Sequence, residues 1–506
     1  MEKLTKRILA IVLIAVIGVG VGVTVWIFVA PYGWSATDCP GAPAGITEDQ
    51  IIKIGIAGDT KRIHGEGQVH GAWLAAYQIN TGTGAIGSLY PGGGMLIGGK
   101  RYYIGITSED TDEANPILDT TKGKAAADRL VSYKNVQFAA GGFRTESLLA
   151  YRDVFMDNKI PFINIGSATD SFTEDVLNNY EQYKYFFQLT PIKGTDLAKE
   201  LIALILTSSI VATSFPAGVL GGYGSPVLRF SFVRESLEWT EGFAQAITAF
   251  LTNSSGANPY MVMTYTGVDI EIPQDIGPTE MDAHWATLDA ENTQIVIPII
   301  SGEAGLIFSN SYGDNEPGMI PIGINVMSQD SAYWTQTNER CEYGITLESV
   351  IRTNKTSYTI DIWDDYVAKW GDMPIYTSVG GFDAVSQYAW AINTSQSLNP
   401  DTIVTTLESM TTTNPVEGWS AFGAYDNADT PPNDKTRHCI VEGWPYGTSL
   451  AIQWVNGTKR LVPGIGIYPS GIWATSLGKS APYTYELFGM ESVRYPSWGL
   501  NSYLPP

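Results

Sequence analysis

Residues 136–173 read VQFAAGGFRTESLLAYRDVFMDNKIPFINIGSATDSFT, and their pattern carries most of the information about the fold. A short apolar run at residues 136–140 passes through two glycines into an amphipathic segment at 145–158, and a second apolar run follows at 160–165. A strand, a helix and a strand of these lengths form a right-handed crossover between parallel neighbours. The stretch therefore predicts an α/β protein with a doubly wound parallel sheet.

The same alternation continues in both directions along the chain. Before this stretch it predicts strands at residues 51–57 and 102–107 and helices at 66–80 and 114–134. After it, a second α/β unit is predicted from strands at 228–233 and 293–300, helices at 239–251, 360–369 and 383–392, and a hairpin at 451–462 that turns at Asn456-Gly457. We expect two lobes of this kind to face each other and form a cleft.

The first 34 residues differ from the rest of the chain. Lys3, Lys6 and Arg7 precede an uninterrupted apolar run at residues 8–30. A bilayer core needs roughly 20 apolar helical residues, whereas a signal-peptide core has about 7–15. We expect residues 1–34 to form a single transmembrane anchor with its basic end in the cytoplasm, which places the body outside the cell membrane. The alternative is a long signal peptide that is cleaved. Residues 35–50, rich in proline and glycine, are predicted to be a linker.

Composition argues against several classes of function. The net charge of −22 repels nucleic acid, so no nucleic-acid partner is expected. The four histidines show no metal-binding spacing and the chain has no G-x-S-x-G nucleophile elbow, so we expect no enzyme, no metal and no cofactor. In the oxidising environment outside the cell we expect a disulfide between Cys341 and Cys439, which leaves Cys39 unpaired. An outside location is also compatible with glycosylation at the sequons of Asn253, Asn354, Asn393 and Asn456.

Two loops in the opening stretch have the chemistry of an anion site. Residues 141–147 and 166–169 each follow a predicted parallel strand, and open α/β sheets bind ligands at the carboxyl ends of their strands. Backbone N–H groups and the positive end of a helix dipole favour an anion there, and Thr145 adds a hydroxyl donor. The alternative is that both loops are ordinary turns between strands and helices.

In the order and spacing of its segments, the chain resembles the leucine/isoleucine/valine-type solute receptors of ABC importers, which have the type I periplasmic-binding fold. The resemblance spans about residues 51–465 and is carried by residues 71–80 (GAWLAAYQIN), 105–111 (GITSEDT), 136–173, 380–394 (GGFDAVSQYAWAINT) and 451–464 (AIQWVNGTKRLVPG). It implies lobe one at residues 51–189 and 348–442 and lobe two at 190–347 and 443–506. The crossovers between the lobes would lie near Leu189, Leu347 and Glu442.

The resemblance also implies site residues. The substrate carboxylate would be held by Thr145, Ser167, Ala168 and Thr169. His64 falls where the family has an aromatic residue over the ligand, and Trp239 falls where lobe two supplies an aromatic lid. The alternatives are a surface role for His64 and a core role for Trp239. Arg144 departs from the family, and it would strengthen anion binding by a bidentate contact if it points inward.

The ammonium group of an amino acid has no evident partner in the sequence. The family supplies a carboxylate on the loop after the strand that leads to Asn325, and here no acid stands in register. Glu303 or Asp330 could substitute, or the ligand carries no ammonium group.

The resemblance implies a solute-binding protein that captures a small polar solute, an amino acid or related carboxylate, for the permease of an ABC importer. The alternatives are a structural or adhesive surface protein on the same fold and a sensor ectodomain.

Overall fold

The computed structural model describes residues 32–214, 227–254, 262–426, 436–443 and 446–462, together with two short paired strands, β1 (Ala15–Val16) and β2 (Val25–Trp26). The predicted anchor lies almost entirely outside the described residues. Of the helices that are described, none is both long and apolar enough to cross a membrane. The α/β class predicted from the sequence is confirmed by two separate sheets with helices around them.

The first sheet has six strands in the order β4-β5-β3-β6-β7-β8, all parallel except the β4–β5 pair. Their bounds are β3 (Ile51–Gly58), β4 (Met95–Ile97), β5 (Lys100–Asp110), β6 (Phe138–Gly141), β7 (Phe162–Asn164) and β8 (Phe186–Gln188). The inner strands are continuous apolar runs because helices cover both faces of a parallel sheet. These helices are α1 (Ile63–Thr81), α2 (Thr120–Asp128), α3 (Thr145–Asp157), α4 (Ser171–Asn178) and α5 (Tyr180–Tyr183), with short turns η3 (Gly87–Leu89) and the π-helical η4 (Arg129–Tyr133).

One predicted helix starts later than expected. The segment 114–134 was expected to be helical throughout, but α2 begins at Thr120. Pro116 disfavours helical backbone in the residue before it. Asp119 then caps the helix, since its side chain accepts the N–H of Thr121 at 3.0 Å.

The second sheet has seven strands in the order β10-β9-β11-β12-β13-β16-β17, and only the two pairings that involve β16 are antiparallel. Their bounds are β9 (Val227–Glu235), β10 (Val262–Ile272), β11 (Ile295–Ile300), β12 (Ile320–Asn325), β13 (Ile345–Glu348), β16 (Leu450–Val455) and β17 (Thr458–Leu461). The accompanying helices are α6 (Gly194–Ser214), α7 (Glu238–Ser254), α8 (Pro278–Ala290), α9 (Ala304–Asn315), η5 (Val326–Gln329) and α10 (Tyr333–Gln336). Positive φ angles at Asn456 and Gly457 give the β16–β17 hairpin its predicted two-residue turn.

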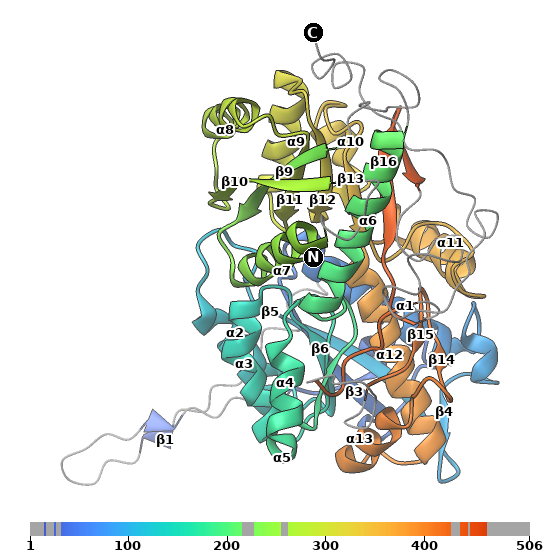
Figure 1. The fold of residues 1–506 in the computed structure, drawn as a ribbon. Helices are drawn as coiled ribbons and strands as arrows, with labels where there is room; N and C mark the ends of the chain where they lie inside the picture. The colour runs from blue at the N-terminus through green and yellow to red at the C-terminus, as the bar shows by residue number, and fades with distance from the viewer. Residues whose placement is uncertain are drawn as a thin grey trace, which may run out of the picture.

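The chain returns to the first sheet before it completes the second. Figure 1 shows the late helices, in orange, beside the blue elements of the first sheet. These late elements are α11 (Thr359–Trp370), α12 (Tyr376–Ser395), α13 (Pro400–Glu408), β14 (Val416–Glu417) and β15 (Phe422–Gly423). A Cβ at Gly71 of α1 would lie 1.9 Å from the carbonyl oxygen of Ser378, so only glycine lets α1 and α12 pack this closely. We call the first sheet with these helices lobe one, and the second sheet with its helices lobe two. The chain passes between them after β8, after β13 and before β16.

Part of the predicted linker belongs to the globular body. Residues 32–50 contain two short turns, η1 (Ala36–Asp38) and η2 (Glu48–Gln50). Trp34 and Cys39 are buried, and the indole N–H of Trp34 donates to the carbonyl oxygen of Lys134 at 2.6 Å. The amide of Asn80 donates to the carbonyl oxygen of Pro40 at 2.9 Å. The linker prediction is therefore wrong around Cys39 and Pro40, because composition alone does not show that these residues pack against the body. Trp34, at the end of the predicted anchor, also packs into the body, against Gly105.

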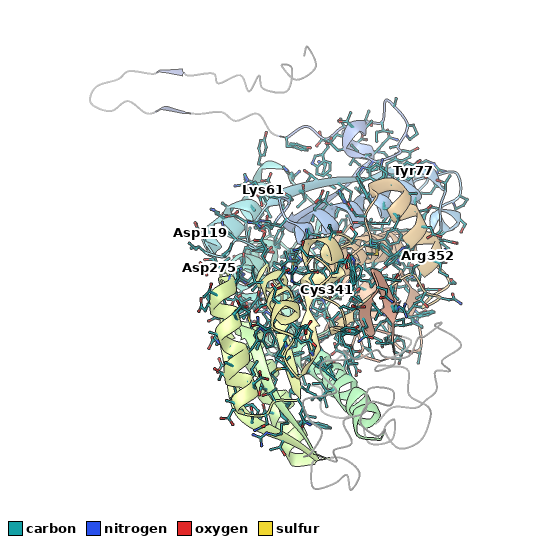
Figure 2. All side chains as sticks on the ribbon, turned by 90° about the horizontal axis from the view of Figure 1, so that it is seen from above. Lys61, Tyr77, Asp119, Asp275, Cys341 and Arg352 are labelled. Atoms are coloured by element: carbon teal, nitrogen blue, oxygen red, sulfur yellow. The ribbon has the colours of Figure 1, made fainter. Side chains whose placement is uncertain are left out.

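The predicted disulfide is also wrong. Cys39, Cys341 and Cys439 are all buried free thiols. Cys341, labelled in Figure 2, packs with Tyr333 and Trp454 in lobe two. Cys439 forms a β-bridge with Gln188 at the edge of the lobe-one sheet. The two cysteines pack against different lobes, which is why they do not pair.

Candidate ligand-binding cleft

A cavity lies between the two lobes and encloses about 660 Å³, part of it open to solvent. Its walls come from loops that follow β6, β7, β9, β11 and β12 and from the three connections between the lobes. Such a position, outside the carboxyl ends of the strands, is where open α/β sheets bind ligands. Most of the lining is apolar: Phe143, Pro191, Leu197, Leu237, Trp239, Ile324, Val326, Leu347 and Tyr376.

Arg144 and Thr145 line the cavity at the amino end of α3, as the sequence predicted for an anion site. The Thr145 hydroxyl is buried and has no hydrogen-bond partner. Arg144 is buried, its guanidinium donates to the side-chain oxygen of Gln274 in lobe two, and its Nε has no partner. Both residues thus present unused donors beside the positive end of a 13-residue helix.

Two backbone N–H groups of this loop are less available to a ligand than the sequence suggested. The N–H groups of Phe143 and Arg144 both donate to one carboxylate oxygen of the buried Glu113, at 3.1 and 3.0 Å. Burial raises the pKa of Glu113 to about 7. A ligand at this end of the cavity would therefore be held by side chains and by the helix dipole more than by these two N–H groups.

The second predicted loop contributes less to the cavity. Gly166 and Ala168 line it, and Ser167 and Thr169 do not. Ser167 is held by Asn164, whose amide oxygen accepts its N–H at 3.1 Å and whose amide group donates to its carbonyl oxygen at 2.9 Å. Thr169 lies within hydrogen-bond distance of Ser171, with 3.2 Å between the hydroxyl oxygens.

The two aromatic candidates have different positions. Trp239 lines the cavity from lobe two and is partly buried, with its ring edge-on to Phe243. His64 is buried behind the wall, stacked on Phe143 with 4.0 Å between ring centroids. Burial lowers the pKa of His64 to about 3, so the ring is neutral. The structure therefore brings Arg144, Thr145, Ala168 and Trp239 together and leaves His64 in a supporting position.

None of the acids suggested by the sequence faces the cavity. Glu303 forms an ion pair with Arg62 of lobe one, and Asp330 accepts the N–H of Ala332 at 2.8 Å. Asn325, the last residue of β12 before the loop where the family has a carboxylate, points into lobe two and donates to the carbonyl oxygen of Gly305 at 3.0 Å.

Glu348 is the acid that lines the cavity, and sequence reasoning missed it. It is the last residue of β13 and is buried. One carboxylate oxygen lies 2.7 Å from Nζ of Lys459 on β17, and the other has no partner. Burial raises the pKa of Glu348 to about 7, and the nearby Lys459 partly opposes this rise. No sequence signal could have shown the pair, because its members are separated by more than a hundred residues.

Several polar contacts join the lobes around the cavity, and one of them is a bond of 2.8 Å from the Tyr376 N–H to the side-chain oxygen of Gln329. Others are the Arg62–Glu303 ion pair, the Arg144–Gln274 hydrogen bond, and a bond of 2.9 Å from the Glu238 N–H to the carboxylate of Glu146. The structure therefore has the lobes in a closed arrangement.

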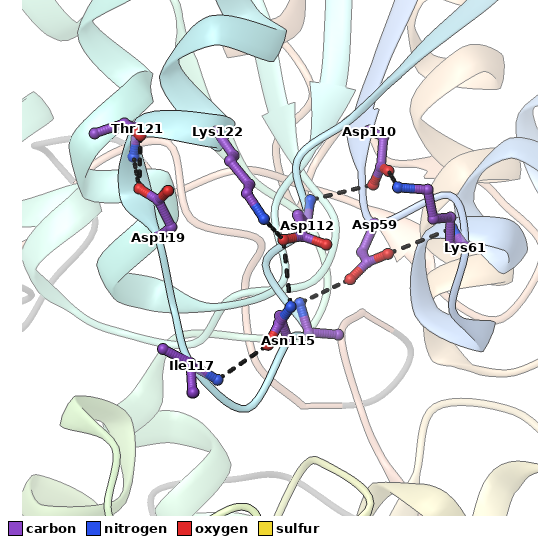
Figure 3. Close-up of polar contacts among 10 residues, drawn as sticks. Asp59, Lys61, Asp110, Asp112, Asn115, Ile117, Asp119, Thr121 and Lys122 are labelled. Carbon is purple, nitrogen blue, oxygen red and sulfur yellow. Dashed lines mark hydrogen bonds and ion pairs between the residues drawn. The ribbon is translucent and has the colours of Figure 1, made fainter.

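A cluster of acids after β3 and β5 fixes the loops next to the cleft (Figure 3). Asp59 accepts the N–H of Ala114 at 3.0 Å, Lys61 pairs with Asp110, and Lys122 pairs with Asp112. Each of these carboxylates is already engaged with the protein. Across the described part of the chain, no group of three or more histidine, cysteine or acidic residues could hold a metal ion.

Comparison with known proteins supports the fold. A family model described as "Periplasmic binding protein" matches residues 54–439. No curated protein matches the sequence.

Solved structures with the same fold include three solute-binding proteins. One, from R. palustris in complex with benzoate, has a TM-score of 0.59 at 12% identity, over 81% of this chain and 95% of that one. The branched-chain amino acid transporter substrate binding protein of Streptococcus pneumoniae, in complex with isoleucine, has a TM-score of 0.58 at 15% identity, over 81% and 99%. A leucine binding protein of Thermotoga maritima has a TM-score of 0.59 at 13% identity, over 81% and 98%.

At these identities the structural likeness shows the fold alone, while the family model covers most of the chain. This chain therefore belongs to the periplasmic binding protein family.

Proposed function

We propose that this protein captures a small carboxylate, an amino acid or a related acid, in the cleft between its lobes and presents it to an ABC importer. The observation that carries the proposal is the pair of unused donors on Arg144 and Thr145 at the end of a mostly apolar cavity. Buried donors without partners are costly unless a ligand satisfies them. We further propose that the protein binds its solute without changing it chemically.

The ligand would lie with its carboxylate at the amino end of α3 and its apolar part against the aromatic and aliphatic walls. Arginine and a hydroxyl can form charge-assisted hydrogen bonds with a carboxylate. Trp239 and Leu237 would cover the apolar part from lobe two. Two of the similar proteins were solved with benzoate and isoleucine, which both combine a carboxylate with an apolar body.

The test starts from the purified full-length chain. Native mass spectrometry before and after denaturation detects a ligand that is carried through purification, and calorimetry with benzoate, isoleucine and leucine measures binding directly. We expect at least one carboxylate to bind at a 1:1 ratio. A chain that carries no small molecule and binds no carboxylate would contradict the proposal and would favour a structural or adhesive role.

We also propose that the body lies outside the cell membrane, tethered through residues 1–34. The basis is the sequence alone: Lys3, Lys6 and Arg7 precede an apolar run long enough to span a bilayer. Protease added to intact cells should degrade the body and spare a cytoplasmic control protein. Full protection of the body in intact cells, with degradation after lysis, would refute this location.

A further inference from the structure

Glu348 and Lys459 form a buried pair at the edge of the cavity, and only one half of the carboxylate is used. The side chains of Glu348 and Lys459 are 1% and 3% exposed, and Nζ of Lys459 lies 2.7 Å from one carboxylate oxygen. Lys459 also donates to the carbonyl oxygen of Gln329 at 3.1 Å, so its position is fixed. The other oxygen of Glu348 is buried without a partner, in a residue that lines the cavity.

This arrangement differs from an isolated buried carboxylate. An isolated carboxylate needs a cation, and a ligand ammonium group would supply one. Here Lys459 already balances the charge of Glu348, so the free oxygen lacks only a hydrogen-bond donor. A ligand ammonium group would add a second buried positive charge next to Lys459, and like charges in a poorly solvated site repel each other strongly.

Glu348 is the only acid among the described residues that line the cavity. Among the described residues that line the cavity, Arg144 and Glu348 are the only charged ones. Arg144 lies beside Thr145 at the amino end of α3, where a carboxylate is favoured. Asn325 is turned into lobe two and engaged there. The cavity thus combines one end suited to a carboxylate with a charged acceptor whose charge is already balanced.

We propose that Glu348, with its charge balanced by Lys459, selects ligands whose second polar group is a neutral donor such as a hydroxyl, so that the protein prefers apolar hydroxy acids to amino acids. This inference rests on the proposed function, since it assumes that a carboxylate occupies the cleft. It assigns Glu348 as a specificity-determining residue and Lys459 as the residue that positions it.

Calorimetry on the full-length chain with two matched series of probes tests the preference. One series is 4-methylpentanoate, 2-hydroxy-4-methylpentanoate and leucine, and the other is benzoate, 4-hydroxybenzoate and 4-(aminomethyl)benzoate. In each series the members carry no second polar group, a hydroxyl, or an ammonium group. In at least one series the hydroxy acid should bind about tenfold or more tightly than both other members, the effect of one hydrogen bond to a charged group.

The variant Lys459→Met gives the sharpest readout. It leaves Glu348 as an isolated buried carboxylate, so the order of affinities should reverse and the ammonium compound should bind best. The matched control is Lys53→Met in lobe one, which removes a lysine paired with Glu48 at 2.6 Å, remote from the cavity, and should leave the order unchanged. The double variant Glu348→Gln/Lys459→Met removes both charges together, so it avoids a buried unpaired ion. It should reduce the advantage of the hydroxy acid without favouring the ammonium compound.

The outcomes separate the two proposals. If no member of either series binds the wild-type chain, the proposed function fails and this inference fails with it. If carboxylates bind but the wild-type chain prefers the ammonium or the unsubstituted compound, the inference is wrong and the proposed function stands. The same conclusion follows if a folded Lys459→Met variant keeps the wild-type order.

Discussion

Replacing Thr145 with valine should preserve or raise the stability of the unliganded protein and lower its affinity for a carboxylate ligand. The Thr145 hydroxyl is buried without a partner, and the residue is 1% exposed. Valine has nearly the same shape and removes the unsatisfied polar group. We expect the free energy of unfolding without ligand to stay the same or rise by about 1 kcal/mol, because an unpaired buried hydroxyl is costly.

The effect on binding should have the opposite sign. If the hydroxyl donates to a ligand carboxylate, its loss removes a hydrogen bond to a charged group, worth about 1.5–3 kcal/mol. Since each 1.4 kcal/mol is a factor of ten, the dissociation constant should rise roughly 10- to 150-fold. A residue with a purely structural role would not combine unchanged stability with a large loss of affinity.

The assay is calorimetric titration with the carboxylate that binds best, together with urea denaturation without ligand. Thr173→Val is the matched control, because the Thr173 hydroxyl is also in a fully buried residue but donates to the carbonyl oxygen of Asp170 at 3.1 Å. That variant should lose about 0.5–1.5 kcal/mol of stability and keep its affinity. The reasoning is refuted if Thr145→Val behaves like the control.

Three further predictions concern the pH dependence, the thiols and the contact between the lobes. Burial raises the pKa of Glu113 to about 7, above the value of 4.5 for an exposed glutamate, so the stability from this group is complete below pH 4.5 and is lost as the pH rises through 7. In denaturant melts, the free energy of unfolding of the wild type minus that of Glu113→Gln should therefore fall by on the order of 2 kcal/mol between pH 5 and pH 8. If this difference does not change with pH, the raised pKa of Glu113 is refuted. Cys39, Cys341 and Cys439 are buried and free, and burial raises the pKa of Cys39 and of Cys341 to about 12, so a thiol reagent should label all three only after unfolding, without any reductant. Labelling of fewer than three thiols in denaturant would indicate a disulfide. Glu303→Gln breaks the exposed Arg62–Glu303 pair and should weaken ligand binding by less than about fivefold, and a larger loss measured by calorimetry would mean that this pair controls closure.

Much of the secondary structure could be predicted because its signals are local. The apolar run at β3, the helix that starts at Thr145 and the Asn456-Gly457 hairpin are each specified by residues within a few positions of one another. The same local logic placed the loops that contain Arg144, Thr145 and Ala168 near the cleft, because each loop follows a predicted strand and the ends of parallel strands meet at one edge. Trp239 was placed there by the resemblance to the solute receptors.

The direction of each side chain within the loops was decided only by tertiary packing. His64 is stacked behind Phe143, and Ser167 and Thr169 do not line the cavity, although all three belong to segments that border the cleft. Composition also predicted a linker where Cys39 is buried in the body, and an outside location suggested a disulfide between two cysteines that are buried as free thiols.

The sequence by itself determined the α/β class, many of the strands and helices in their order, and which strand ends would gather at one place, since these depend on periodicity and on short-range caps and turns. It did not show α6, β10, α8 and α9. The pairing of Glu348 with Lys459 depends instead on β13, β16 and β17 lying side by side, an arrangement that long-range burial creates. An ion pair between distant segments leaves no local pattern, so only the folded chain shows which acid faces the cavity and that its charge is already balanced.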